Sequence, residues 1–308
     1  MKEFVILLEM SASTNEVQSI WQAIHPLFEE QTASLKVIEV SLDNPRDFKN
    51  LASFKEVSPV ITIGSSQLLI EAISYLNSQS KLCPVCFIPT KSTTNLAKSI
   101  GLALQPQTAA KQILTAIQPV YVELAKIEEM NHQRRWLFNR SMSLGFNAYA
   151  ENVSQNSQLN KFSVSRIAQW YGHLTAIVDQ EPFNVTLRLD RKYYFFRHAF
   201  AVQVDNQAKV SDQPLDLKKL PLRIEILSNL NLFSLLLFKI AKLVGLEHKL
   251  PYVHIFKGSS FQLTTDSLEF GEIDGQQLKN QFYDLLARSF QYPFWFDPDN
   301  LSLHEQNK

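Results

Sequence analysis

Glycine and cysteine are scarce in this sequence, and neither sign of charge is in excess. Only eight of the 308 residues are glycine and two are cysteine. Thirty basic and thirty acidic side chains give a formal charge of zero, which removes any whole-chain argument for nucleic acid or for an anionic membrane surface. Hydrophobic residues make up 45% of the chain and charged residues 19%, as in ordinary folded proteins. We therefore expect a folded protein without a nucleic-acid partner.

Long hydrophobic runs are also missing. The most apolar stretch, residues 230–246, is interrupted by Lys239 and Lys242 and is shorter than the roughly 20 residues that span a bilayer. The first residues, MKEFVILLEM, predict a strand rather than a signal peptide, because no small-residue cleavage site follows them. We expect a cytoplasmic protein with at most peripheral membrane contact.

The two cysteines form a single Cys83-x-x-Cys86 pair inside an expected core strand. A metal or redox site would need a second pair of ligands, so buried thiols are favoured.

The length exceeds that of a single hydrophobic core and predicts two domains. Residues 1–128 alternate between strand and helix patterns, which predicts a Rossmann-like, mostly parallel sheet with helices on both faces. The expected strands are Phe4–Leu8, Leu35–Val40, Val60–Ile63 and Cys83–Ile88, and the last expected helix is Thr108–Ile117. An earlier helix, which contains Leu96, Ala97 and Ile100, is expected to end at Gly101.

Residues 129–308 predict a second, β-rich and sandwich-like domain, whose final segment could return to the first domain. Expected strands are Val120–Ile127, Arg135–Leu144, Phe183–Leu189, Tyr193–Val204, Leu222–Leu227, Val253–Leu263 and Phe282–Phe296. Ser163–Val178 predicts an amphipathic helix. Leu232–Val244 is apolar on nearly all faces, which favours a core helix over one that touches a membrane or covers a lipid tail.

Two strand-to-helix corners could meet a phosphate group: Gly64-Ser65-Ser66 and Pro89–Asn95. Both place hydroxyl groups and backbone N–H groups at a helix N-terminus, where an anion is favoured, and Lys91 adds positive charge. Neither corner is glycine-rich, so its backbone cannot easily approach a pyrophosphate. Local chemistry therefore favours simple helix capping by Ser66 and by one of Ser92–Thr94.

The order and spacing of these corners resemble the bacterial diacylglycerol kinase and sphingosine kinase-like lipid kinases over nearly the whole chain. The family's strand–GGDGT–x-x-E loop is similar to Gly64-Ser65-Ser66-Gln67-Leu68 with Glu71, and its P-x-G-T-x-N-D-F-A corner is similar to Pro89–Ala97. Its F-x-N…G-F-D-A segment resembles Phe138-Asn139-Arg140…Gly145-Phe146-Asn147-Ala148, and its final DGE resembles Asp274-Gly275-Gln276.

This resemblance implies an α/β nucleotide domain followed by a β-rich domain, with the active site in a cleft between them. It also implies ATP-dependent, Mg²⁺-assisted phosphate transfer to a lipid hydroxyl, with nucleotide and lipid as partners, and it allows a homodimer through the β-rich domain. Asp274 would be the catalytic base. The nucleotide would contact Gly64, Ser65, Ser66, Glu71, Thr90, Lys91, Ser92, Thr93 and Thr94.

The departures from the family pattern concern the groups that hold metal and phosphate. Four family carboxylates are replaced, at Ser66, Asn95, Asn147 and Gln276. Loop glycines are replaced at Ser65, Gln67 and Lys91, and the family's N-P-x-S-G corner is unrecognisable in Glu9-Met10-Ser11-Ala12. Because Mg²⁺ requires carboxylate or phosphate oxygens, the sequence predicts a kinase fold with doubtful Mg²⁺ binding and weakened or lost catalysis. The fold would keep a nucleotide- or lipid-shaped cleft for binding or regulation, in which ATP could still bind.

Two alternatives stay open from the sequence. The chain could be an active kinase in which Lys91 supplies charge in place of a metal, or a structural protein whose cleft is filled by its own side chains. Asp274 also has two readings, because Asp-Gly is a leading type I′ hairpin signal, and the turn is favoured over the base.

Overall fold

The computed structural model describes residues 2–10, 14–42, 48–49, 51, 58–79, 83–131, 134–138, 140–146, 148–149, 181–206, 210–216, 221–229 and 232–299. The expected helix Ser163–Val178 lies outside these residues, as does Asn147. The chain divides into two compact units. Unit 1 comprises Met1–Leu124, Ala208–Leu215 and Gln291–Lys308, and unit 2 comprises Ala125–Gln207 and Asp216–Phe290.

Unit 1 is built on a parallel sheet of buried strands. Its strands are β1 (Lys2–Glu9), β2 (Thr32–Val40), β3 (Val60–Ile63) and β4 (Val85–Ile88), in the spatial order β4-β3-β1-β2. Each neighbouring pair is parallel, and every residue of β3 and β4 is buried. These strands confirm the expected ones to within a few residues at each end.

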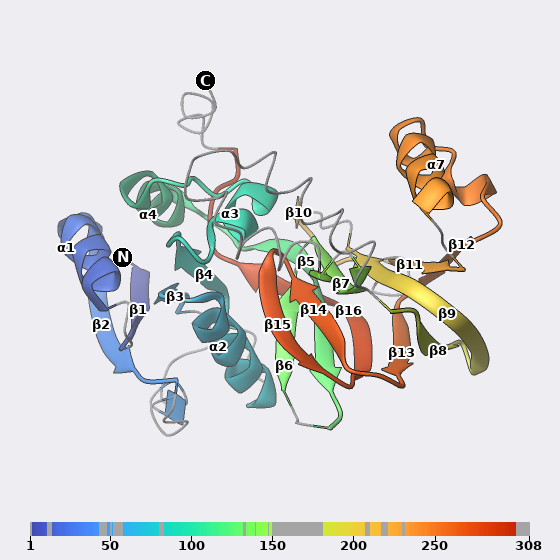
Figure 1. Cartoon of the computed structure of the whole chain (residues 1–308). Coiled ribbons are helices and arrows are strands. Elements are labelled where there is room, and N and C mark those ends of the chain that lie inside the picture. Colours follow the sequence, from blue (N-terminus) through green and yellow to red (C-terminus); the bar gives the residue numbers. More distant parts are fainter. Residues whose placement is uncertain are drawn as a thin grey trace, which may run out of the picture. The chain divides into compact units, whose positions relative to one another are not determined.

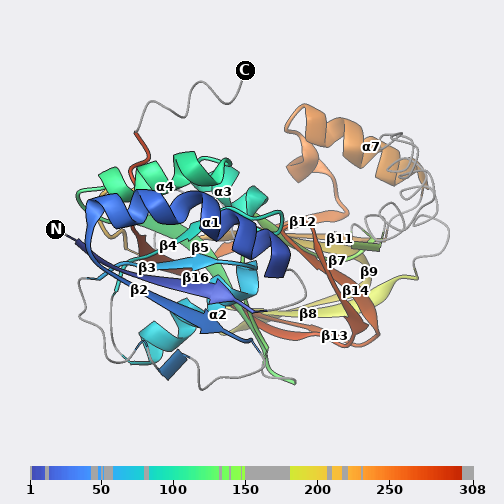
Figure 2. The same ribbon diagram turned by 90° about the vertical axis from the view of Figure 1, so that its left-hand side faces the viewer.

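Helices cover both faces of this sheet, as a buried parallel sheet requires. They are α1 (Thr14–Gln31), α2 (Ser66–Ser78), α3 (Thr94–Ile100) and α4 (Pro106–Thr115). Figures 1 and 2 show α2 on the opposite face from α1, α3 and α4. Gly101 ends α3 with a φ of +81°, the left-handed C-terminal conformation expected of a glycine stop.

The end of the chain completes unit 1. Strand β16 (Asp284–Phe294) begins in unit 2, and its last residue, Phe294, pairs in parallel with Val85 of β4. Two-residue strand β10 (Val210–Ser211) pairs with the start of β5 (Val120–Glu129).

Unit 2 is an antiparallel arrangement, so the molecule's sheet is mixed. Its further strands are β6 (Arg135–Phe138), β7 (Ser141–Gly145), β8 (Phe183–Leu189), β9 (Lys192–Asp205), β11 (Leu222–Ser228), β12 (Val253–Gly258), β13 (Ser260–Thr265), β14 (Glu269–Ile273) and β15 (Gln276–Gln281). The expected single strand Val253–Leu263 is two strands, because β12 pairs with β11 whereas β13 pairs with β8 and β16.

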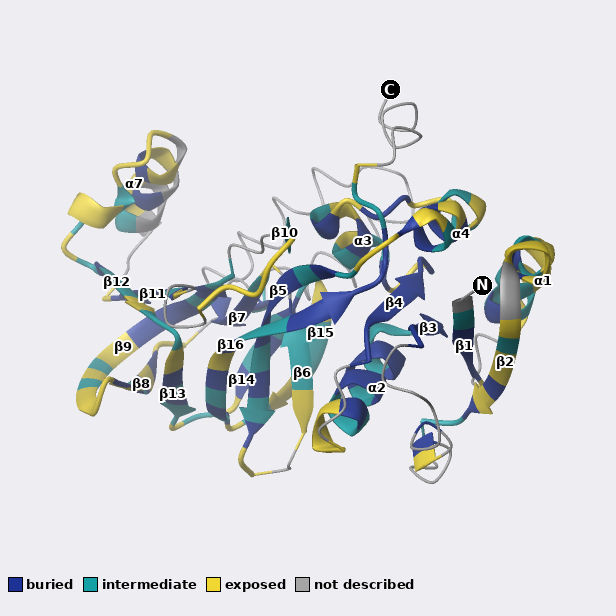
Figure 3. Ribbon diagram, turned by 180° about the vertical axis from the view of Figure 1, so that it is seen from behind, coloured by how far each residue is buried: buried dark blue, intermediate teal, exposed yellow. Residues whose placement is uncertain are grey.

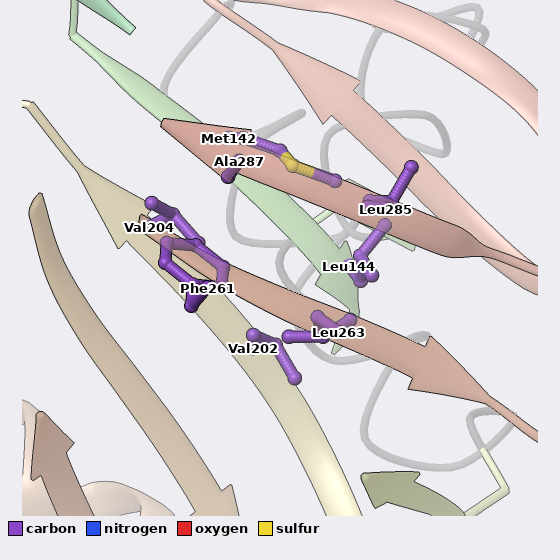
Figure 4. A pocket seen from close by; sticks show the side chains of 8 residues that line it. All are labelled: Met142, Leu144, Val202, Val204, Phe261, Leu263, Leu285 and Ala287. Carbon is purple, nitrogen blue, oxygen red and sulfur yellow. The ribbon is translucent and has the colours of Figure 1, made fainter. Parts of the chain in front are cut away.

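The core of unit 2 is closely packed. Figure 4 shows apolar side chains of β7, β9, β13 and β16 lying close to one another. The space that they enclose is about 10 Å³. That volume is at the lower limit for one water molecule, and its lining is apolar. This part of the unit is therefore a filled core rather than a ligand cavity.

Helix α7 (Leu232–Leu243) corrects an expectation from the sequence. Phe238 and Ala241 are buried, but Phe233 is 75% exposed and Ile240 is 52% exposed. Figure 3 shows both buried and exposed stretches on α7. The prediction of an ordinary core helix is wrong, because α7 buries only one side while its apolar residues continue around the other.

No helix in the described part of the chain is long and apolar enough to cross a membrane.

Candidate functional site

The two corners singled out from the sequence meet at the carboxyl edge of the unit 1 sheet, where α/β proteins usually bind ligands. Gly64 follows β3 and Pro89 follows β4, and these strands are parallel neighbours. The Thr90 hydroxyl donates a 2.8 Å hydrogen bond to the Gly64 carbonyl oxygen and so ties one corner to the other. The structure therefore brings the predicted nucleotide residues of both loops together.

In the first corner, Ser65 is the N-cap of α2. Its backbone is extended (φ −74°, ψ 163°), and its Oγ accepts a hydrogen bond from the Leu68 N–H at 3.4 Å. The sequence predicted capping by Ser66, but Ser66 is the first helical residue. Capping is thus confirmed as the local role of this corner, one residue earlier than expected.

Glu9 is the residue that sequence reasoning missed. It ends β1, it is only 4% exposed, and its carboxylate accepts a hydrogen bond from the Ser65 N–H. It also lies so close to Gly64 that a Cβ added there would be 2.5 Å from the Glu9 Cβ. A carboxylate of the chain itself therefore holds the place at the start of α2 where the family resemblance would put phosphate.

The backbone N–H groups of Thr90 and Lys91 in the second corner also have partners within the chain. The Thr90 N–H donates to Thr93 Oγ1 at 2.9 Å, and the Thr94 hydroxyl donates to the Thr90 carbonyl oxygen at 3.0 Å. The Lys91 N–H donates to Glu16 Oε1 at 3.1 Å, while the Lys91 and Ser92 residues are exposed. Thr93 is the N-cap residue of α3, but its hydroxyl oxygen accepts the hydrogen bond from the Thr90 N–H and makes no capping hydrogen bond to the helix.

Glu71 is the one family carboxylate retained in the first loop. Gln67, one turn earlier on α2, donates a 2.7 Å hydrogen bond from Nε2 to Glu71 Oε1. The replacement of a family glycine by Gln67 thus supplies a partner for this carboxylate within the same helix.

Asp274 lies in unit 2, in the hairpin turn between β14 and β15. Asp274 and Gly275 have φ values of +48° and +85°, the left-handed pair that a type I′ turn requires. The Asp274 Oδ1 accepts hydrogen bonds from the Arg140 and Ser141 N–H groups at 2.9 and 3.0 Å. The predicted turn is confirmed, and its carboxylate ties one hairpin to the backbone that precedes β7.

The metal ion that the resemblance implies does not fit these residues. Within the described ranges, no group of three or more His, Cys, Asp or Glu side chains is gathered as a metal site would need. Ser66 and Asn95 stand where family carboxylates would be, and the carboxylate beside Ser65, that of Glu9, is engaged with the backbone. We therefore assign no step to Mg²⁺.

Three other features in the described part of the chain do not make a phosphate or catalytic site. Cys83 and Cys86 are buried and form no disulfide, and burial raises the pKa of the Cys86 thiol to about 12, so this thiol is inert. An open pocket of about 320 Å³ in unit 2 has Glu181 and Glu269 in its lining, and none of its described lining residues is cationic, so it does not suit a phosphate group. Ser228 Oγ lies 3.0 Å from His254 Nε2, but Ser228 is only 3% exposed.

Comparison with known proteins extends this description. No protein-family model matches the sequence, and no curated protein matches it. Among solved structures, one called a "putative diacylglycerol kinase" from Bacillus anthracis str. Sterne superposes with a TM-score of 0.62 at 18% identity, covering 96% of this chain and 98% of that one. A second, of a diacylglycerol kinase from the same organism, has a TM-score of 0.61 with the same identity and coverage. The chain therefore has the fold of the diacylglycerol kinase-like lipid kinases.

Proposed function

We propose that this chain has the lipid-kinase fold but has lost conventional ATP-dependent phosphoryl transfer. It acts by binding a ligand or a partner rather than by catalysing a reaction. The observation that carries the proposal is Glu9, whose buried carboxylate accepts the Ser65 N–H at the start of α2. A helix N-terminus attracts anions because its N–H groups lack partners, and here an internal anion already has that role.

The repulsion between the Glu9 carboxylate and a phosphate group is large enough to prevent tight phosphate binding. A phosphate oxygen about 4 Å from the Glu9 carboxylate would experience a repulsion of about 4 kcal/mol per unit charge at an effective dielectric constant of about 20. That energy corresponds to a loss of roughly a thousandfold in affinity. The family uses metal ions to offset such charge, and the replaced carboxylates at Ser66, Asn95 and Gln276 leave no ready means of holding them.

The second corner supports the same conclusion. Its Thr90 and Lys91 N–H groups are taken by Thr93 and Glu16, so a phosphate would have to displace two internal hydrogen bonds. What the corner still offers is the exposed Lys91. A kinase of altered chemistry would have to rely on this lysine, which is the alternative function that the sequence left open.

The test combines nucleotide binding with catalysis. We expect the thermal unfolding midpoint of the wild-type chain to be unchanged by ATP, with or without Mg²⁺, and no transfer of labelled phosphate to diacylglycerol in vesicles. Labelled transfer well above background, abolished by Asp274→Asn, would contradict the proposal. ATP stabilisation that disappears in Lys91→Ala would favour the altered kinase.

A charge-neutral variant isolates the role of Glu9. Glu9→Gln keeps the size of the side chain and an acceptor for the Ser65 N–H but removes the negative charge, so the variant should gain affinity for inorganic phosphate. Glu3→Gln is the matched control, because Glu3 is on the same strand but at its other end, near Ser58. Equal phosphate affinity of wild type and Glu9→Gln would show that Glu9 is not the block.

A further inference from the structure

The proposed function does not use the open pocket in unit 2. This pocket measures about 320 Å³, and its lining comes from three segments that are distant in the sequence. Tyr149 follows β7, Glu181 and Pro182 precede β8, and Ser267–Phe270 lead into and begin β14. Small-molecule sites typically have volumes of about 300–1,000 Å³, so a small organic molecule would fit. We call this space the β14 pocket.

One part of the lining is aromatic and apolar. The Tyr149 and Phe270 rings are in contact, with their centroids 4.8 Å apart and their planes inclined by 38°. Pro182 and Leu268, which is 56% exposed, add apolar surface. Aromatic rings bind apolar groups, and their faces also attract organic cations. This part of the pocket therefore suits an apolar or a cationic organic group.

The charged part of the lining is acidic. Glu269 is only 4% exposed, and its Oε1 accepts a 2.7 Å hydrogen bond from the hydroxyl of Ser267, another lining residue. Glu181 is exposed, and none of the described lining residues is basic. A positively charged ligand would be attracted by both carboxylates. The attraction to Glu269 would be the stronger one, because burial reduces the screening of its charge by water.

A buried tyrosine near Glu269 lies in the same negative potential. The pKa of Tyr283 is raised above its usual value, first by burial and then by the carboxylates of Glu129 and Glu269, whereas Arg134 acts in the opposite direction. A carboxylate raises the pKa of a phenol because it opposes the formation of a second negative charge. The surroundings of the β14 pocket thus add to the preference of its lining for a cation.

The chemistry of the lining separates the classes of ligand. An anion would be repelled by the two carboxylates. A bare metal ion would need more oxygen ligands, and the described ranges hold no group of three or more His, Cys, Asp or Glu side chains. A neutral apolar molecule would cover Glu269 without compensating its charge, which is costly. An organic cation satisfies both the acidic and the aromatic part.

We propose that the β14 pocket binds a small organic cation, an ammonium compound that carries apolar groups. Its charge is balanced by Glu269, and its apolar groups pack against Tyr149 and Phe270. This binding needs neither phosphate nor a metal ion, and it uses no residue of the two corners in unit 1. It goes beyond the proposed function, and either proposal can fail without the other.

The experiment is calorimetric titration of the full chain, without nucleotide, with choline as the probe. The matched ligand is 3,3-dimethylbutan-1-ol, which has the shape of choline but a carbon atom in place of the charged nitrogen. Choline should bind at least about tenfold more tightly, because only choline is attracted by the carboxylates. Equal affinity for the two compounds, or no measurable binding of choline, would overturn the proposal.

Three variants assign the charge. Glu269→Gln should weaken choline binding about tenfold or more, and Glu181→Gln about two- to threefold because this carboxylate is exposed. Asp190→Asn is the matched control, since Asp190 is an exposed acid of unit 2 outside the lining, and it should bind choline like wild type. Unchanged affinity in Glu269→Gln, or an equal loss in Asp190→Asn, would contradict a site at Glu269.

A second measurement does not depend on substituting the buried Glu269. In nuclear magnetic resonance spectra, the methyl protons of choline should show nuclear Overhauser effects to aromatic ring protons of the protein. Phe270→Leu keeps an apolar side chain but removes one ring, so it should weaken these effects and lower the affinity several-fold. Circular dichroism checks that this variant is folded. Methyl protons without any contact to aromatic protons, or full affinity in a folded Phe270→Leu, would exclude the β14 pocket as the site.

Discussion

A carboxylate placed against backbone N–H groups competes with any external anion for the same donors. Glu9 does this at the start of α2, and Asp274 does it at the start of β7. In both places the carboxylate accepts hydrogen bonds from backbone N–H groups of the same chain. The retention of an acidic residue at a family position is thus weak evidence for catalysis, because the same residue can serve the fold.

Asp274 allows these two roles to be separated by substitution. Asp274→Ala should lower the free energy of unfolding by about 2–3 kcal/mol, because it removes the acceptor of two N–H groups and puts alanine in a left-handed conformation. Asp274→Asn should cost less than about 1 kcal/mol, since asparagine keeps an acceptor oxygen and tolerates that conformation. Urea denaturation measures both values. If Asn is as damaging as Ala, the turn-anchor role is wrong.

At the scale of single elements, glycines mark where β7 and α3 end. Gly145, in the family-like Gly145-Phe146 pair, has a φ of +76°, and a Cβ there would be 2.6 Å from the Phe183 ring and 2.8 Å from the Phe200 carbonyl oxygen. Gly101 has a similar φ of +81°, but a Cβ there would meet no atom within 4 Å. The two positions share conformational strain and differ in packing.

This contrast gives a matched pair of variants. Gly101→Ala should cost about 1 kcal/mol, the price of the left-handed conformation alone. Gly145→Ala should cost about 1–3 kcal/mol more, because a backbone oxygen and a buried ring must move. Thermal or urea unfolding of the two variants measures the difference, and equal losses would mean that packing at Gly145 is looser than described.

The attachment of α7 predicts a dependence on pH. Glu247 lies just after α7, and its pKa is held below its usual value of 4.5 by its own backbone N–H and by the Arg223 guanidinium, against the opposing effect of burial. A depressed pKa in the folded state contributes stability that is present above pH of about 4.5 and is lost as pH falls through the folded value.

We therefore expect acid to loosen this end of unit 2 partly through Glu247. Glu247→Gln should lower stability at neutral pH and show a smaller loss between pH of about 5 and 3 than wild type. Denaturation measured across this pH range, with the exposed Glu29→Gln as control, tests the expectation. Parallel pH profiles for wild type and Glu247→Gln would contradict it.

At the scale of the whole molecule, unit 1 depends on the last described residues of the chain. Trp295 is 8% exposed; its Nε1 donates to the Ile113 carbonyl oxygen at 3.1 Å, and its backbone N–H donates to Val85 at 2.7 Å. Gln112 Nε2 donates to the Asp297 carbonyl oxygen at 3.0 Å. Residues separated by almost 200 positions thus close the same α/β unit.

Trp295→Ala should destabilise the protein by about 3–5 kcal/mol, as expected for removal of a buried tryptophan side chain. Trp295→Phe keeps most of the packing and loses one hydrogen bond, so it should cost about 1–2 kcal/mol. Guanidinium unfolding monitored by circular dichroism measures both. A tolerated Trp295→Ala would mean that the final segment is an accessory to unit 1.

Much of unit 1 and one turn of unit 2 were predictable because their signals are local. Strands β3 and β4 are continuous apolar runs. Gly101 ends a helix and Asp274-Gly275 form a turn, each with the left-handed backbone conformation that these residue types favour. Glu9 could not be found this way, since its partner Ser65 is 56 residues away and only the sheet order brings them together. Likewise, the apolar composition of α7 does not reveal how many of its side chains pack against the rest of the unit, and several of them are exposed.

The return of the chain to unit 1 has a consequence for biosynthesis. A ribosome releases β1 to β4 and their helices first, yet the strand that pairs with the outer side of β4 and the tryptophan that packs beside α4 emerge only after all of unit 2. Domains generally fold as units during synthesis, N-terminal first. Here unit 1 cannot be finished until the residues after all of unit 2 have been synthesised, so a nascent chain truncated before them would expose apolar strands to chaperones and proteases.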